Sequence, residues 1–178
     1  MASSKATNID YVQTYFVKKE LTRIHGEPTF DTLRVLRDEI KANAGAVTTT
    51  LGGGALGYLG LLFSATDYNR VAPGTPFQRP LVPAPLDIPA RTTQHEATKL
   101  REDHAEALRV YRECMDVENA LIGQVLQAIE DKFTKCIKNR TTQRVEATLE
   151  QLFTTLFQRY GFVTQHQLAD YENEVRKY

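Results

Sequence analysis

The fold class of this chain follows from TTQHEATKLREDHAEALRVYRECMDVENALIGQ, residues 92–124. Thr93 and Glu96 have the spacing of a capping box, in which two side chains satisfy free backbone N–H groups at a helix start. Apolar residues then recur every three or four positions, the period of an amphipathic helix. They form two adjoining stripes: Ala97, Leu100, Leu108, Tyr111 and Met115, and beside them Val110, Cys114, Val117 and Leu121. The stretch therefore predicts a long helix.

Helical signals continue toward the C-terminus. A further apolar series consists of Ile122, Val125, Leu126, Ile129, Phe133 and Ile137. Asn119 or Gly123 is expected to break or kink the join between the two series. After a polar connector at 138–147, Thr148 and Gln151 form a second capping box, and Gly161 ends its helix. A third box at Thr164 predicts a last helix. We expect a structural core in which Leu152, Phe153 and Leu156 pack against Ile122, Val125 and Ile129.

Shorter helices are expected before residue 92. A capping box at Thr7 opens the first, which Gly26 should end. Its apolar residues at helical spacing are Ile9, Val12, Phe16, Val17, Leu21 and Ile24. A second helix follows Thr29 and should fade by 43–45, with Phe30, Leu33, Leu36 and Ile40 facing inward. Ser64 and Asp67 open a short helix that reaches about Val71.

A proline-rich segment separates these helices from the long one. Six prolines stand between Pro73 and Pro89. A helix interior cannot hold them, because proline lacks an N–H and clashes with the preceding turn. This segment is therefore predicted to be an extended arm. Its apolar members suggest that it lies along the domain: Phe77, Leu81, Val82, Leu86 and Ile88.

Together these signals predict a single all-α domain of five or six helices with a glycine-rich loop and a proline-rich extended arm. The domain spans 1–178, with N-terminal helices at 1–46, the loop and arm at 47–92, and a helical core at 93–178. Lysine and arginine, 22 residues, balance 22 aspartate and glutamate residues, so the chain has no global attraction to nucleic acid or acidic membranes. Neither a signal peptide nor a membrane span is recognisable, so we expect a cytoplasmic protein.

The glycine stretch LGGGALGYLG, residues 51–60, raises the question of nucleotide binding. Gly52, Gly54 and Gly57 match the G-x-G-x-x-G spacing that cradles a pyrophosphate. That motif needs a β-α-β unit and an acidic residue about 20 positions further on, and the sequence supplies neither. We therefore interpret Gly52, Gly53, Gly54 and Gly57 as a structural loop with tight turns in apolar surroundings. A nucleotide-binding enzyme is kept as an alternative.

No other enzymatic chemistry is indicated. His95 and His104 are nine residues apart, not at the four-residue spacing of a zinc-protease helix. Cys114 and Cys136 lack metal-site spacing and fall on apolar helical stripes, which favours inert thiols. None of the three serines stands in a nucleophile motif. We expect no catalytic residue, metal, cofactor or small-molecule substrate.

One local cluster of positive charge is a candidate binding surface. Lys135, Lys138, Arg140 and Arg144 gather around the connector. They would make a weak RNA contact, because the charges are few, no aromatic residues interleave with them, and each phosphate contact weakens with salt. A solvated loop is the alternative interpretation.

Several segments in order resemble the Gag-like region of copia-type LTR retrotransposons, especially the branch found in diatoms and other algae. They are GEPTFDTLRVL, TTLGGGALGYLGLLFSATDY, the arm PFQRPLVPAPLDIP, the stretch around the long helix, and TLEQLFTTLFQRYGFVT. The likeness covers nearly all of the chain from Gly26. It implies a helical capsid-type domain that self-associates into particles around element RNA.

The sequence departs from that family's usual plan. A second helical lobe, a Cys-Cys-His-Cys zinc knuckle and the polyprotein enzymes are not recognisable in the 178 residues. An N-terminal capsid portion, a truncated element and a piece retained by a host genome all stay open as origins. So does a different function class, a helical adapter or scaffold, because amphipathic stripes of the same kind could bind another protein.

Overall fold

The structure of the protein, a computed structural model, describes residues 11–163. The helices are α2 (Phe30–Ala46), α3 (Ala65–Val71), α4 (Gln94–Ala128), α5 (Asp131–Thr134) and α6 (Leu149–Tyr160), with 3-10 turns η1 (Gly54–Leu56) and η2 (Leu59–Leu61). The described residues form no strand beyond two isolated bridges, which confirms the all-α fold class. None of their helices is long and apolar enough to cross a membrane. The helix predicted after Thr164 lies outside the described residues.

Helix α4 is the longest element and runs without interruption for 35 residues. The predicted capping box of Thr93 and Glu96 is formed at its start. The predicted break at Asn119 or Gly123 is wrong, because both residues lie inside the continuous helix. A glycine in a helix costs only about 1 kcal/mol relative to alanine. The neighbouring Leu121 and Val125 are fully buried, and their packing outweighs that cost.

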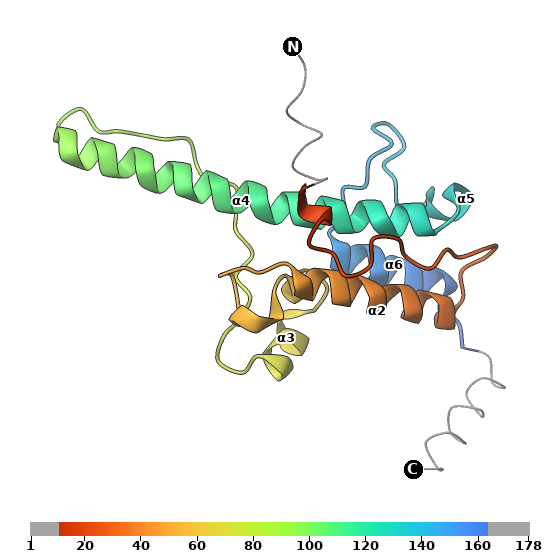
Figure 1. Cartoon of the computed structure of the whole chain (residues 1–178). Coiled ribbons are helices and arrows are strands. Elements are labelled where there is room, and N and C mark those ends of the chain that lie inside the picture. Colours follow the sequence, from red (N-terminus) through yellow and green to blue (C-terminus); the bar gives the residue numbers. More distant parts are fainter. Residues whose placement is uncertain (1–10, 164–178) are drawn as a thin grey trace.

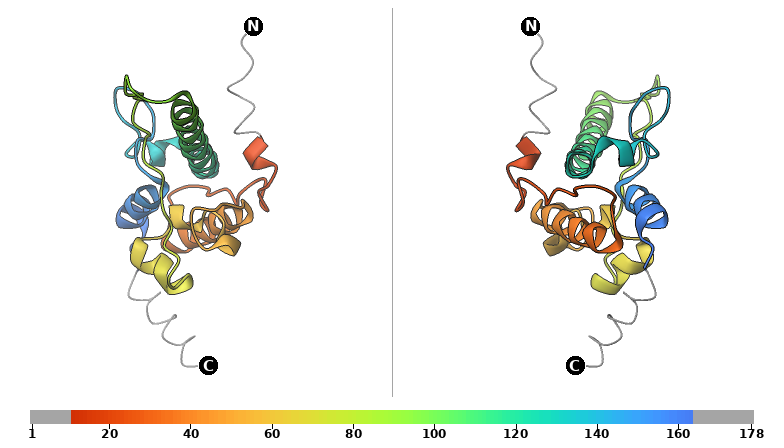
Figure 2. Two further views of the ribbon diagram at one scale, coloured as in Figure 1. Left: turned by 90° about the vertical axis from the view of Figure 1, so that its left-hand side faces the viewer. Right: turned by 90° about the vertical axis from the view of Figure 1, so that its right-hand side faces the viewer.

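The core lies between the carboxyl half of α4 and a layer formed by α2 and α6 (Figures 1 and 2). Both helices of that layer begin with complete capping boxes, at Thr29 and Thr148. Their inward faces are fully buried: Leu33, Leu36 and Ile40 on α2, and Leu149, Leu152, Phe153 and Leu156 on α6. Ile122, Val125 and Ile129 belong to the same buried cluster. Ile129 lies just past the end of α4, on extended backbone.

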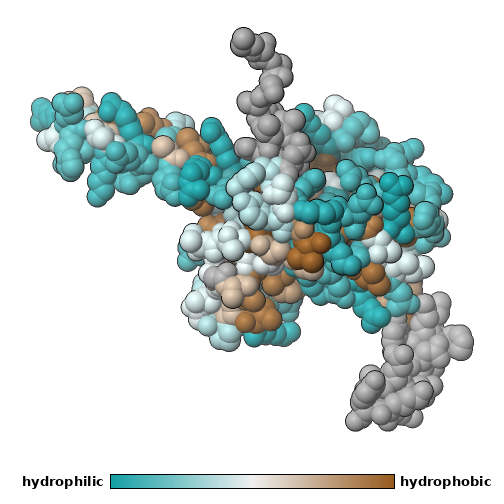
Figure 3. Space-filling view, in the orientation of Figure 1, coloured by the Kyte–Doolittle hydropathy of each residue, from teal (hydrophilic) through white to brown (hydrophobic). Residues whose placement is uncertain are grey.

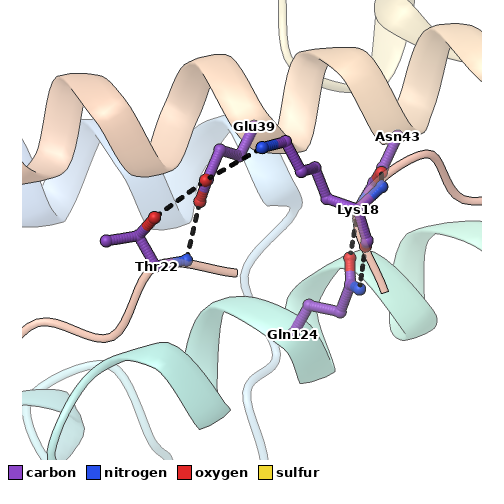
Figure 4. Close-up of polar contacts among 5 residues, drawn as sticks. All are labelled: Lys18, Thr22, Glu39, Asn43 and Gln124. Atoms are coloured by element: carbon purple, nitrogen blue, oxygen red, sulfur yellow. Dashed lines mark hydrogen bonds and ion pairs between the residues drawn. The ribbon is translucent and has the colours of Figure 1, made fainter. Parts of the chain in front are cut away.

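The N-terminal segment corrects another prediction. Helix is present at 11–13, but the described residues from 14 to 29 are irregular, so the helix expected to reach Gly26 is not formed. Side chains of α2 and α4 bind this backbone instead (Figure 4). The Lys18 N–H donates to Asn43 Oδ1 at 2.7 Å, and the Lys18 carbonyl accepts from Asn43 Nδ2 and Gln124 Nε2. Asn43 and Gln124 are buried, so their hydrogen bonds to the segment favour its non-helical path over solvent-exposed alternatives.

The glycine-rich loop and the proline arm meet around two aromatic side chains. Phe77, from the arm, packs edge-on against Tyr68 and lies beside Gly60, where an added Cβ would overlap its ring. The Tyr68 hydroxyl accepts a hydrogen bond from the Gly53 N–H at 3.0 Å. Gly57 has a positive φ of 51° and its Cα faces three backbone carbonyls, so a side chain there would be both strained and crowded. The loop is thus shaped by close packing.

A buried carboxylate joins the arm to the core. Glu118 on α4 is 2% exposed and pairs with the guanidinium of Arg79 through both carboxylate oxygens. Its Oε1 atom also accepts from the Leu149 N–H at 3.0 Å. One side chain therefore holds the arm and the first turn of α6 against α4, and its own charge is compensated.

Beyond Arg79 the arm accompanies the amino half of α4, and the two project together from the body (Figure 1). This projecting unit comprises the arm from Pro80 and the amino half of α4, and Ala97 is the one buried residue between Pro80 and Glu113. Leu81 is 86% exposed and Val82 71% exposed, and Leu86 and Leu100 are also exposed. The arm is extended as predicted, but its apolar residues pack on the domain mainly at Phe77. Figure 3 shows apolar side chains along this unit among hydrophilic ones.

Candidate functional site

A strongly basic hollow lies where α5, the connector and the carboxyl end of α6 meet. Its volume is about 730 Å³. We call it the basic hollow, and its lining residues are Lys132, Lys135, Cys136, Lys138, Arg140, Gln143, Arg159 and Tyr160. Five of these side chains are cationic and none is acidic. The shape and charge favour an anionic ligand.

Local hydrogen bonds give the connector a defined path. Lys138 and Val145 form an antiparallel bridge, and the Asn139 N–H donates to the Arg144 carbonyl at 2.8 Å. The Asn139 side chain accepts from the N–H groups of Thr141 and Thr142, an arrangement that stabilises tight turns. The connector is therefore a closed hairpin-like loop rather than a loose tether. Its residues Lys138 and Arg140 line the hollow.

Two aromatic residues hold the carboxyl end of α6 beside α5. The Tyr160 hydroxyl donates to the Phe133 carbonyl at 3.1 Å, and the two rings lie edge to face at 5.8 Å. This contact ties the end of α6 to α5, which Figure 1 shows at the same end of the body. It also brings Arg159, whose guanidinium lies 5.8 Å from the Tyr160 ring centroid, into the same hollow as Lys132 of α5 and the following Lys135. Burial raises the pKa of the Tyr160 hydroxyl.

The cations of the hollow differ in how they are compensated. Lys132 pairs with Glu130 at 2.8 Å, and Lys138 pairs with Asp131. These contacts lower the pKa of both carboxyl groups, through the hydrogen bond from Lys132 for Glu130 and that from Lys138 for Asp131. Within residues 11–163, no carboxylate lies at ion-pair distance from the other three cations, which are Lys135, Arg140 and Arg159.

The structure brings together three of the residues that the sequence suggested for RNA contact. Lys135, Lys138 and Arg140 line the basic hollow, whereas Arg144 does not. Sequence reasoning missed Lys132 and Arg159. Lys132 could have been found by extending the local charge count. Arg159 could not, because its approach depends on how α6 packs against α5.

The glycine loop offers no comparable space at its motif positions. The volumes next to Gly52 and Gly60 are filled by the side chains of Tyr68 and Phe77, and the Gly53 N–H is already bonded to Tyr68. A phosphate bound there would have to displace both aromatic side chains. These contacts favour the structural interpretation of Gly52, Gly53, Gly54 and Gly57 over the nucleotide-binding alternative.

The remaining candidate groups do not converge. In the described part of the chain, no three histidine, cysteine, aspartate or glutamate side chains gather as metal ligands would. Cys114 is buried in the core, while Cys136 is exposed at the hollow, contrary to the expectation of two inert thiols on apolar stripes. Comparison of the chain with protein-family models, curated proteins and solved structures gave no match.

Proposed function

We propose that this chain is a structural, Gag-like capsid protein of a retroelement, or a derivative retained by a host, which self-associates into particles and contacts RNA weakly. The proposal starts from the sequence likeness to copia-type Gag regions. The all-α fold agrees with it. In this function the chain carries out no catalysis and works through its surfaces.

The observation that carries the proposal is the projecting unit formed by the amino half of α4 and the arm. Isolated helices are only marginally stable in water, so a helix that leaves the body gains from a partner. This one is accompanied by an arm whose Leu81 and Val82 face solvent, with Leu100 exposed on the helix itself. Exposed apolar surface of this kind commonly marks sites of protein association.

Sedimentation velocity across a wide range of protein concentration tests self-association. We expect a monomer or weak oligomer at micromolar concentration, with the average mass rising as concentration rises. Replacement of Leu81 and Leu100 by serine should abolish that rise. Val71→Ser is the matched control, because Val71 is also an exposed apolar residue but lies on α3.

A monomer at every concentration would contradict self-association and favour the adapter alternative, in which the same surface binds a different protein. A control variant that loses assembly as fully as the double variant would show that the projecting unit is not the relevant surface. Circular dichroism of each variant establishes that its helices are intact.

A further inference from the structure

We infer that the basic hollow is a binding site for single-stranded RNA, in which Lys135, Arg140 and Arg159 contact backbone phosphates and Tyr160 lies beside a base. This inference rests on the RNA part of the proposed function, and it names the site, the strand class and the residues. It adds Arg159 from α6 and excludes Arg144, so it differs from a simple run of basic residues around the connector.

The cations of the hollow that lack an ion-pair partner are the expected principal contacts to RNA phosphates. Lys132 and Lys138 form ion pairs with carboxylates, whereas Lys135, Arg140 and Arg159 form no ion pair within the described residues, and Asp131 acts on Lys135 only at longer range. Like charges that share a hollow repel one another, and a bound anion relieves this repulsion. Arginine guanidinium groups also bind phosphate through two parallel hydrogen bonds, which a lysine cannot do. The charges and guanidinium groups of the hollow therefore favour the binding of phosphate groups.

The volume of the hollow and the presence of Tyr160 in its lining favour a nucleic acid strand over a single phosphate as the ligand. The volume of about 730 Å³ far exceeds that of one phosphate group, and the cations come from three separate segments. Tyr160 lines the hollow with the Arg159 guanidinium next to its ring. Cationic grooves with aromatic and arginine side chains are typical of proteins that bind single strands, whose bases are free to stack. Duplex RNA offers mainly phosphates and ribose hydroxyls instead.

Fluorescence anisotropy with a labelled single-stranded oligouridine tests the site in the full chain. Lys135→Ala, Arg140→Ala and Arg159→Ala should each weaken binding, and each should reduce the slope of log affinity against log salt by about 0.7, the value for one single-strand phosphate contact. Arg144→Ala is the control inside the connector. Lys99→Ala, on the projecting end of α4, is the control for net charge. Both controls should bind as the wild type does.

The exposed thiol of Cys136 gives a readout at the site itself. Because Cys136 lines the hollow and Cys114 is buried, a neutral maleimide should react at Cys136 alone, and bound oligouridine should slow that reaction. The triple variant that lacks Lys135, Arg140 and Arg159 should show no protection. Duplex RNA of equal charge should protect less than the single strand.

Several results would overturn the inference. If the triple variant binds oligouridine as the wild type does, or if binding leaves the Cys136 rate unchanged, RNA binds elsewhere, and only the site assignment fails. Equal protection by the duplex would refute the strand class. An absence of binding even at low salt would remove both this inference and the RNA part of the proposed function. Self-association would still be decided separately by sedimentation.

Discussion

At the scale of single residues, the two cysteines occupy opposite environments. Cys114 is buried in the core, and burial raises the pKa of its thiol to about 11, so at pH 8 it is almost entirely protonated. The thiolate is the form that alkylating reagents attack. Iodoacetamide at pH 8 should therefore modify Cys136 and spare Cys114 until urea unfolds the chain. Peptide mass mapping measures this, and equal labelling rates in the folded protein would contradict the buried position.

Leu156 tests the core at the same scale. Its side chain is fully buried where α6 faces α2 and α4. Leu156→Ala removes packed methyl groups and leaves a cavity, which should lower the free energy of unfolding by about 2–5 kcal/mol. Urea denaturation measures the change. Gln158→Ala, on the exposed side of the same helix, should stay within about 0.5 kcal/mol of the wild type. A similarly small effect at Leu156 would place α6 outside the core.

At the scale of elements, two glycines test different contributions to stability: Gly60 tests the packing of the arm, and Gly123 tests the helix propensity of α4. Gly60→Ala would place a Cβ only 2.0 Å from the nearest ring carbon of Phe77, so the arm must shift and the protein should lose about 1–3 kcal/mol, the usual cost of overpacking. Gly123→Ala meets nothing within 4 Å inside α4 and should gain up to about 1 kcal/mol from helix propensity. Thermal unfolding should show a lower melting temperature for Gly60→Ala and a higher one for Gly123→Ala. A stable Gly60→Ala variant would mean that Phe77 does not hold the arm.

Elements with local signals were predictable, and those fixed by distant partners were not. Capping boxes at Thr93 and Thr148 correctly marked helix starts, because both partners of each box lie three residues apart. The segment after residue 13 has helical periodicity, but Lys18 is bound by Asn43 and Gln124, which lie 25 and 106 positions away. The residues of the basic hollow also differ in whether the sequence could predict them. Lys135, Lys138 and Arg140 are neighbours in sequence, whereas Arg159 reaches them only through tertiary packing.

At the scale of the whole molecule, the two proposed interactions should respond to salt in opposite directions. RNA contact through the basic hollow depends on phosphate contacts, so its affinity should fall steeply between about 50 and 200 mM salt. Self-association through Leu81, Val82 and Leu100 depends on apolar burial, which salts such as sulfate strengthen. The chain also carries balanced charge, 22 basic against 22 acidic residues, so repulsion between copies is small at any salt concentration.

Light scattering and RNA anisotropy on the same sample, over one sulfate titration, would measure both responses. We expect scattering to rise while anisotropy falls. The Leu81 and Leu100 serine variant should lose the first response and keep the second, and the triple variant of the hollow should do the reverse. Independent loss of the two responses requires that assembly and RNA contact use different surfaces. The projecting unit and α5 lie at opposite ends of the molecule, as Figure 1 shows. Scattering that falls as sulfate rises would instead mean that copies associate through charged groups, and the projecting unit would then not be the assembly surface.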